Sequence, residues 1–275
     1  MTIDQKRKLL EGAAAILGAS IHGLSTRNPE ELGACARDLA ANCDVIVVAG
    51  GDGTFSDIIN AIDTARKPVA FLPLGTGNAL RHALEYRGNI VDIATRIKEA
   101  RIREYDLINC GNKKRAFMAS VGFDGTVLLL RERYVERGII GPGAFVRSFF
   151  RALIKEYEPV SAKIAVDGHR FEVENMLNLM VVKQPYYGFG MKVIPQARFD
   201  DGFLHVLNVR GGILPAIIGG ATAFTLGNRV GKYYRAQEIK VSLPFSMALQ
   251  LDGNIGWASK TFHFSVIPRG LKIKC

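Results

Sequence analysis

The segment VIVVAGGDGT, residues 45–54, decides the expected fold of this chain. Its first four residues are β-branched, which is typical of a buried strand. Three glycines follow, and residues 55, 58, 59 and 62 are apolar at helical spacing. A buried strand, a glycine loop and a helix N-terminus favour an anion site, because the loop exposes N–H groups and the helix dipole adds positive charge. The alternative is a glycine-rich turn without a ligand.

A second unit of the same kind begins at Val69. The apolar run 69–72 leads into the loop Pro73-Leu74-Gly75-Thr76-Gly77-Asn78, and a helix is predicted from Ala79 to about Tyr86. Alternating strands and helices indicate a parallel sheet, in which ligands bind at the carboxyl ends of the strands. We therefore expect both glycine loops at one edge, forming one site. Taken alone, the second loop could be a helix-capping turn.

The remaining N-terminal residues complete an α/β domain over residues 1–105. Apolar residues on one face predict a helix over residues 4–18, and a second helix is expected over 30–41. Residues 19–22 are expected to form a short strand. Thr54 suits either the N-cap of the helix after the first loop or a phosphate contact.

Residues 106–275 are predicted to form a β-rich, mostly antiparallel domain. Asp167-Gly168 marks a hairpin within residues 161–183. Further short strands are expected at 192–195, 203–209, 238–243, 246–251 and 261–267. The segment 127–157 mixes apolar residues with arginines, which fits a membrane-surface contact or a helix packed on the core. The uncharged run 211–228 contains five glycines and Pro215 and predicts an interior helix rather than a membrane span.

Composition narrows the classes of partner. The formal net charge of +10 predicts attraction to anions such as nucleic acid, acidic lipid or polyphosphate. No arginine-rich tract is present, so nucleic acid is not expected as a partner. The four cysteines are scattered without a C-x-x-C pair, which indicates a reducing cytosol and neither a disulfide framework nor a zinc site. The N-terminus has no signal-peptide core, so a cytoplasmic protein is expected.

Several motifs occur in a defined order. They are GGDGT at 50–54, PLGTGN at 73–78, SVGFD at 120–124, YGFGMKVIP at 187–195, DDGFL at 200–204 and LDGN at 251–254. With this set the chain resembles the diacylglycerol kinase catalytic-domain superfamily, which includes sphingosine and ceramide kinases and bacterial lipid kinases. NAD kinases share the GGDG signature but differ in the later motifs, so they are a distant alternative.

The resemblance implies a Rossmann-like α/β nucleotide domain, a β-rich sandwich-like domain, and transfer of the γ-phosphate of ATP to a lipid hydroxyl. It implies Mg²⁺ as cofactor, because backbone amides and a cation must hold the phosphate charge. Asp52 would work close to the phosphates or their metal. The residues expected to bind nucleotide are Thr26, Gly50, Gly51, Asp52, Gly53, Thr54, Phe55, Ser56, Gly75, Thr76 and Asn78.

The resemblance also assigns a base and a metal ligand. Asp252 is expected to be the general base, since a hydroxyl nucleophile needs a nearby carboxylate as its proton leaves. Asp252-Gly253 could instead be only a hairpin turn, as Asp167-Gly168 is expected to be. Asp201 is expected to bind a structural Mg²⁺ together with the carbonyl groups of Arg198 and Phe203. A D-D-G turn without metal is the alternative.

Three departures from the family pattern matter. The family begins with a strand and an N-P-x-S-G-like loop that this sequence lacks. Asn254 stands where the family has glutamate, and Ala79 follows Asn78 where bacterial diacylglycerol kinases carry aspartate. The last departure favours a sphingoid-like acceptor over diacylglycerol. The first two motivate a second hypothesis, a non-catalytic lipid- or nucleotide-binding protein derived from the kinases.

The sequence therefore predicts a cytoplasmic enzyme of lipid metabolism that binds ATP and Mg²⁺. Its basic surface would hold it peripherally at an anionic membrane, where the lipid lies. A homodimer is left open. The lipid itself is not named by any motif.

Overall fold

The computed structural model describes residues 3–139, 141–156 and 159–275. The chain forms two compact units. The first comprises residues up to Tyr105 together with Pro268–Cys275, and the second comprises Asp106–Ile267. Strands β3 (Ile102–Cys110) and β11 (Asn254–Lys274) each run from one unit into the other.

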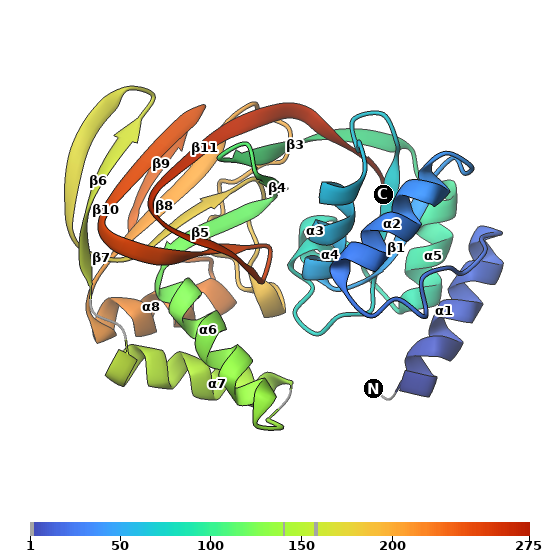
Figure 1. Ribbon diagram of the computed structural model, residues 1–275, viewed down its shortest axis with the longest axis horizontal. Helices are drawn as coiled ribbons and strands as arrows, with labels where there is room; N and C mark the ends of the chain where they lie inside the picture. The colour runs from blue at the N-terminus through green and yellow to red at the C-terminus, as the bar shows by residue number, and fades with distance from the viewer. Residues whose placement is uncertain (1–2, 140, 157–158) are drawn as a thin grey trace. The chain divides into compact units, whose positions relative to one another are not determined.

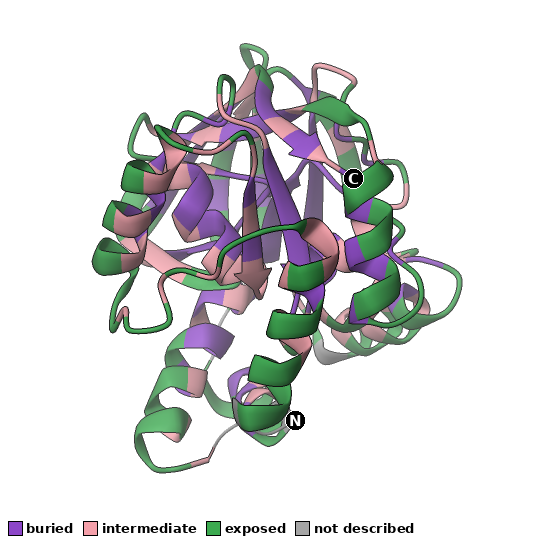
Figure 2. Ribbon diagram, turned by 90° about the vertical axis from the view of Figure 1, so that its right-hand side faces the viewer, coloured by how far each residue is buried: buried purple, intermediate pink, exposed green. Residues whose placement is uncertain are grey.

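The first unit is α/β, as the sequence predicts (Figure 1). Strand β1 pairs in parallel with β2, Ile46 opposite Val69 and Gly50 opposite Pro73, which confirms the parallel pairing expected from the alternating pattern. Figure 2 shows the strands largely buried while the helices expose their outer turns. The elements are α1 (Ile3–Leu17), α2 (Pro29–Ala40), β1 (Ile46–Gly50), α3 (Asp52–Ala61), β2 (Val69–Pro73), α4 (Ala79–Ala83) and α5 (Ile90–Glu99).

Two expectations for this unit are wrong. Residues 19–22 are irregular rather than a strand, because only Ile21 among them offers a large apolar side chain to bury. Residues 268–275, which the sequence assigns to the second domain, pack with the first unit. There Ile273 pairs in parallel with Val69, and Thr64 Oγ1 donates a hydrogen bond to the carbonyl of Gly270 at 2.7 Å.

The second unit is built from antiparallel strands around a buried aliphatic core. The predicted hairpin is confirmed, with Val166 opposite His169 across the Asp167-Gly168 turn. Segments 238–243 and 246–251 form one strand, and 192–195 contributes only an isolated bridge between Lys192 and Tyr186. The strands are β4 (Lys114–Ala116), β5 (Met118–Gly122), β6 (Val160–Val166), β7 (His169–Val182), β8 (Leu204–Arg210), β9 (Lys232–Ala236) and β10 (Glu238–Leu251).

Three helices of this unit gather on one side of its strands: α6 (Phe123–Glu136), α7 (Pro142–Arg151), which continues into a π-turn at Ala152–Glu156, and α8 (Ile213–Phe224) (Figure 1). The prediction that α8 is an interior helix is wrong. Leu214, Ile217 and Phe224 are 68, 53 and 59% exposed. Within the described parts of the chain, no helix is long and apolar enough to span a membrane.

Candidate functional site

The two glycine loops touch at the carboxyl ends of β1 and β2. The N–H groups of Leu74 and Gly75 both donate to the carbonyl of Gly50, at 2.9 and 3.0 Å. A Cβ at Gly75 would lie 2.5 Å from Gly51 Cα, so only glycine permits this approach. The prediction that both loops lie at one edge of the sheet is therefore confirmed.

Asp52 joins the two loops through its carboxylate. Its Oδ2 accepts a hydrogen bond from the N–H of Ala79 at 2.8 Å, and its Oδ1 accepts one from the N–H of Leu80 at 2.9 Å. Burial raises the pKa of Asp52, against the lowering effect of these two hydrogen bonds. Asp52 thus holds the N-terminus of α4 against that of α3, and its contact with phosphates or a metal stays a prediction.

The residues after Asp52 have distinct environments. Gly51 is the N-cap of α3, not Thr54, whose side chain packs against Gly50 instead. Phe55 lies in the core, its ring edge-on to Phe71 with 5.4 Å between centroids, and its N–H donates to the carbonyl of Gly51. Ser56 is also buried. Phe55 therefore has a packing role, and the nucleotide contacts expected from Gly50 to Ser56 stay predictions.

The second loop presents one unusual polar group. Asn78 adopts a left-handed conformation (φ 41°) and donates from Nδ2 to the carbonyl of Gly75 at 2.8 Å. Its Oδ1 is buried and has no hydrogen-bond partner among the described residues. Buried polar atoms are normally hydrogen-bonded, so this oxygen is available to a bound ligand or water. Thr76 is exposed, and Thr26 Oγ1 donates to the carbonyl of Gly23 at 2.7 Å in a local turn. Their nucleotide contacts stay predictions.

Asp252 lies in the second unit, in the turn between β10 and β11. Its side chain is fully buried, and its Oδ1 accepts hydrogen bonds from the N–H groups of Phe117 and Met118 at 3.1 and 2.8 Å. Two N–H donors on one oxygen hold the carboxylate in a fixed orientation. Together with burial, its charge raises the pKa of the nearby Cys110 thiol.

The turn at Asp167-Gly168 has the same backbone geometry as the turn at Asp252-Gly253. Asp167 and Asp252 both have positive φ values, 45° and 49°, and each is followed by a glycine with positive φ. Asp167 Oδ1 likewise accepts two backbone N–H groups, from Gln237 and Glu238 at 2.9 and 2.8 Å. Both aspartates therefore lie in hairpin turns of the same kind, and the role of Asp252 as general base stays a prediction. Burial is what distinguishes Asp252, because Asp167 is exposed.

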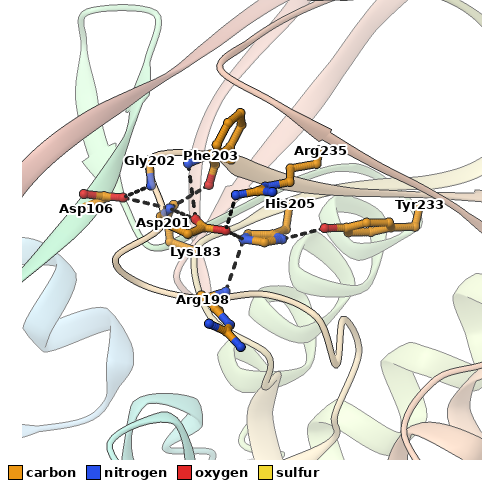
Figure 3. A network of polar contacts seen from close by, with 9 residues as sticks. All are labelled: Asp106, Lys183, Arg198, Asp201, Gly202, Phe203, His205, Tyr233 and Arg235. Carbon is orange, nitrogen blue, oxygen red and sulfur yellow. Dashed lines mark hydrogen bonds and ion pairs between the residues drawn. The ribbon is translucent and has the colours of Figure 1, made fainter.

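Two of the three expected metal ligands, Asp201 and Phe203, contact the buried ammonium of Lys183 (Figure 3). Lys183 Nζ lies 3.0 Å from Asp201 Oδ1 and donates to the carbonyl of Phe203 at 2.6 Å. The N–H of Arg198 points to His205 Nε2 at 3.2 Å, while the Arg198 side chain extends away from the cluster.

These residues do not fit a divalent cation. Two of the three oxygens expected to bind Mg²⁺ already accept from Lys183, and Asp201 Oδ2 faces His205 and Arg235 at 3.1 and 3.4 Å. Burial alone would raise the pKa of Asp201, but the hydrogen bond and charge of Lys183 lower it overall. Among the described residues no group of three His, Cys, Asp or Glu side chains could hold a metal ion.

The second unit also contains an apolar cavity that the sequence did not indicate. Its volume is about 590 Å³, and its walls come from α6, α7, α8, β7 and β8. Asp124, Asn178 and Tyr187 supply polar groups to it, and Asn178 Nδ2 donates to Asp124 Oδ2 at 2.8 Å. Burial raises the pKa values of both Asp124 and Tyr187. Asp124 is the final residue of the SVGFD motif, which is the one sequence signal that could have identified it.

By architecture the chain is thus an α/β unit joined to an antiparallel β unit. Residues 3–110 match the family model of the diacylglycerol kinase catalytic domain. Residues 118–274 match that of the YegS C-terminal NAD kinase beta sandwich-like domain. The chain therefore belongs to the diacylglycerol kinase family of lipid kinases.

Named relatives agree with this assignment. The diacylglycerol kinase of Staphylococcus saprophyticus is 29% identical over 80% of this chain and 73% of its own length. That of Staphylococcus aureus is 27% identical over 80% of this chain and 71% of its own length. A diacylglycerol kinase structure from Bacillus anthracis shares the fold, with a TM-score of 0.73, 19% identity and coverage of 100% of this chain and 92% of that chain. An NAD kinase from Archaeoglobus fulgidus, solved with ATP, has a TM-score of 0.50 at 12% identity, covering 100% and 90%.

Proposed function

We propose that this protein transfers the γ-phosphate of ATP to the hydroxyl group of a membrane lipid. The apolar cavity of the second unit carries the proposal, because it offers a hydrocarbon-lined space of ligand size with few polar groups. Asp124 and Tyr187 are the groups available there to orient a hydroxyl-bearing or amine-bearing headgroup. Diacylglycerol-like and sphingoid-like lipids both fit this description.

The glycine loops support binding of the phosphates of ATP in a Rossmann-like unit. The first turn of α3 has N–H groups without intrahelical partners, and Gly50, Gly51 and Gly53 carry no side chain that would keep a phosphate away from the backbone. The buried Oδ1 of Asn78 lies in the same pair of loops. Mg²⁺ bound with ATP would supply additional positive charge for the phosphoryl group.

Asp252 is proposed to accept the proton of the lipid hydroxyl. Its two backbone hydrogen bonds fix the orientation of the carboxylate, so little reorganisation is needed when the proton is transferred.

The exposed apolar side chains of α7 and α8 are proposed to dock on the membrane. Val146 and Phe150 of α7 are 51 and 54% exposed, and both also line the cavity. Arg147 is exposed on the same helix and would pair with anionic headgroups, whereas Arg151 already forms an ion pair with Glu156 at 2.7 Å. A lipid would then enter the cavity from the bilayer without crossing water.

Vesicle sedimentation tests this docking. We expect binding to vesicles that contain anionic lipid, weaker binding to neutral vesicles, and loss of binding in a Phe150→Ser and Ile217→Ser double variant. A matched control replaces Leu24, which is 60% exposed in the first unit, by serine. Equal binding of the double variant and the control would contradict membrane docking through α7 and α8.

Phosphate transfer from radiolabelled Mg·ATP to a lipid panel tests the enzyme. The panel holds diacylglycerol, monoacylglycerol, sphingosine and ceramide in mixed micelles, with NAD as a non-lipid acceptor. Asp252→Asn is compared with Asp167→Asn, because both aspartates bind two backbone N–H groups in the same kind of turn. We expect wild type and Asp167→Asn to label lipid, and the rate of labelling to fall by about 10²–10⁴-fold only in Asp252→Asn.

Three outcomes would contradict the proposal. Equal activity of both variants would remove Asp252 from the reaction. Absence of transfer to any lipid, from protein shown to be folded, would favour the non-catalytic lipid- or nucleotide-binding protein, and label on NAD alone would favour an NAD kinase.

A further inference from the structure

We propose that Lys183 is the built-in structural cation of the loop 198–203, so that this loop is ordered without a divalent metal. The family resemblance assigns a Mg²⁺ to this loop, and the side chains here are arranged around an ammonium instead. The inference concerns the metal requirement of the fold and is independent of the reaction proposed above.

The ammonium of Lys183 has the environment of a bound ion. The side chain is fully buried, and Nζ lies 3.0 Å from Asp106 Oδ2, 3.0 Å from Asp201 Oδ1 and 2.6 Å from the carbonyl of Phe203 (Figure 3). An ammonium has three N–H donors, and three oxygens lie within hydrogen-bond distance of it. Mg²⁺ would require oxygens at about 2.0–2.1 Å in octahedral geometry.

The charges of the cluster balance without a metal. Asp106 and Asp201 are opposed by Lys183 and by Arg235, whose guanidinium lies 3.4 Å from Asp201 Oδ2. Two negative and two positive groups leave no net charge to attract a dication, which would also be repelled by the adjacent ammonium.

The cluster ties the loop to two strands. Asp106 belongs to β3, and its Oδ2 also accepts the N–H of Gly202 at 2.8 Å. Its own N–H donates to the carbonyl of Phe199 at 2.7 Å. Lys183 directly follows β7, so its side chain connects β7, β3 and the loop in one buried contact. A metal in this position would have provided the same connection.

Thermal unfolding of the nucleotide-free protein tests the inference. We expect the same apparent Tm in EDTA and in millimolar MgCl₂, compared at equal ionic strength. Electron paramagnetic resonance should also show that wild type and Asp201→Asn bind the same amount of Mn²⁺. A wild-type Tm that falls in EDTA, or one Mn²⁺ that disappears in Asp201→Asn, would overturn the proposal.

Lys183→Met provides the complementary test, because it keeps most of the side-chain length and removes the charge. Leaving the buried Asp106 and the partly exposed Asp201 without this counter-ion should lower the apparent Tm by roughly 6–20 °C. Added Mg²⁺ or Ca²⁺ should restore part of this loss in Lys183→Met and have no effect on wild type. Lys163→Met, at an exposed lysine of β6, is the matched control and should leave the Tm unchanged. A Lys183→Met protein as stable as this control would refute the role of the ammonium.

Discussion

Alanine at Gly75 and alanine at Gly51, the two glycines in contact between the loops, should have different effects on stability. A Cβ at Gly75 would lie 2.5 Å from Gly51 Cα and 2.7 Å from Asn78 Oδ1, whereas a Cβ at Gly51 would lie 3.5 Å from Gly75 Cα. Carbon atoms pack best at about 3.5–4.0 Å. Gly75→Ala must therefore move the loops apart by about 1 Å, while Gly51→Ala fits without movement.

The cost of Gly75→Ala follows from the contacts that this movement disturbs. Overpacking costs about 1–3 kcal/mol. The hydrogen bonds from Leu74 and Gly75 to the carbonyl of Gly50 would lengthen, at about 0.5–1.5 kcal/mol each. Gly75 has no positive φ, so no backbone strain is added. A loss of about 2–6 kcal/mol lowers the apparent Tm by roughly 4–24 °C for a chain of this size.

Scanning calorimetry and ATP binding by isothermal titration separate folding from function. Gly51→Ala should keep the wild-type Tm but weaken ATP binding about tenfold or more, because its methyl group occupies the place of a phosphate oxygen near the backbone. Gly75→Ala should lower the Tm and weaken ATP binding as well. A Gly75→Ala protein as stable as Gly51→Ala would refute the close contact, and unchanged ATP affinity in Gly51→Ala would refute the phosphate loop.

Three further predictions follow from the second unit. Asp252→Ala should lower the free energy of unfolding by about 2–6 kcal/mol, because two buried N–H groups lose their acceptor. Asp252→Asn keeps an acceptor oxygen and should cost less than half of that. Urea unfolding of the two variants measures this difference, and equal stability of the two would refute the hydrogen bonds. Stability should fall on acidification below pH 6.5, because burial lowers the pKa of His205 and the unfolded chain then binds a proton that the folded state disfavours. It should fall again below pH 3.8, because Lys183 lowers the pKa of Asp201 in the folded state. A Tm–pH curve of His205→Gln that matches wild type between these two pH values would contradict the first step. Ala216→Phe, which narrows the apolar cavity from α8, should raise the KM for lipid several-fold and leave the KM for ATP unchanged, and an equal change in both constants would argue against lipid binding there.

Much of the fold could be predicted from local pattern. The β-branched run before Gly50 forms β1, and the repeated strand, loop and helix units predicted the parallel pairing with β2. The Asp167-Gly168 hairpin followed from the two residue types that accept positive φ. Helix α8 shows the limit of this approach, because an uncharged run predicts burial only if other elements cover it.

Part of the candidate site could also be predicted from the sequence, and part could not. The sequence indicated the glycine loops, but it did not indicate that Asp52 bonds the N-terminus of α4 or that Phe55 belongs to the core. It gave Asp252 and Asp167 different roles, and only burial separates two turns with the same hydrogen-bond pattern.

By itself, the sequence determined the elements whose causes are local: the strand–glycine–helix units, the D-G turns and the order of the family motifs. Backbone sterics and hydrophobic periodicity act over a few residues, so neighbours in the chain are sufficient to specify them. Only the tertiary structure decided that the ammonium of Lys183 lies between Asp106 and Asp201, that Asp124 lines an apolar cavity, and that the outer face of α8 is exposed. Burial and charge pairing depend on which distant segments pack together, and this is why they determine the chemistry of each site.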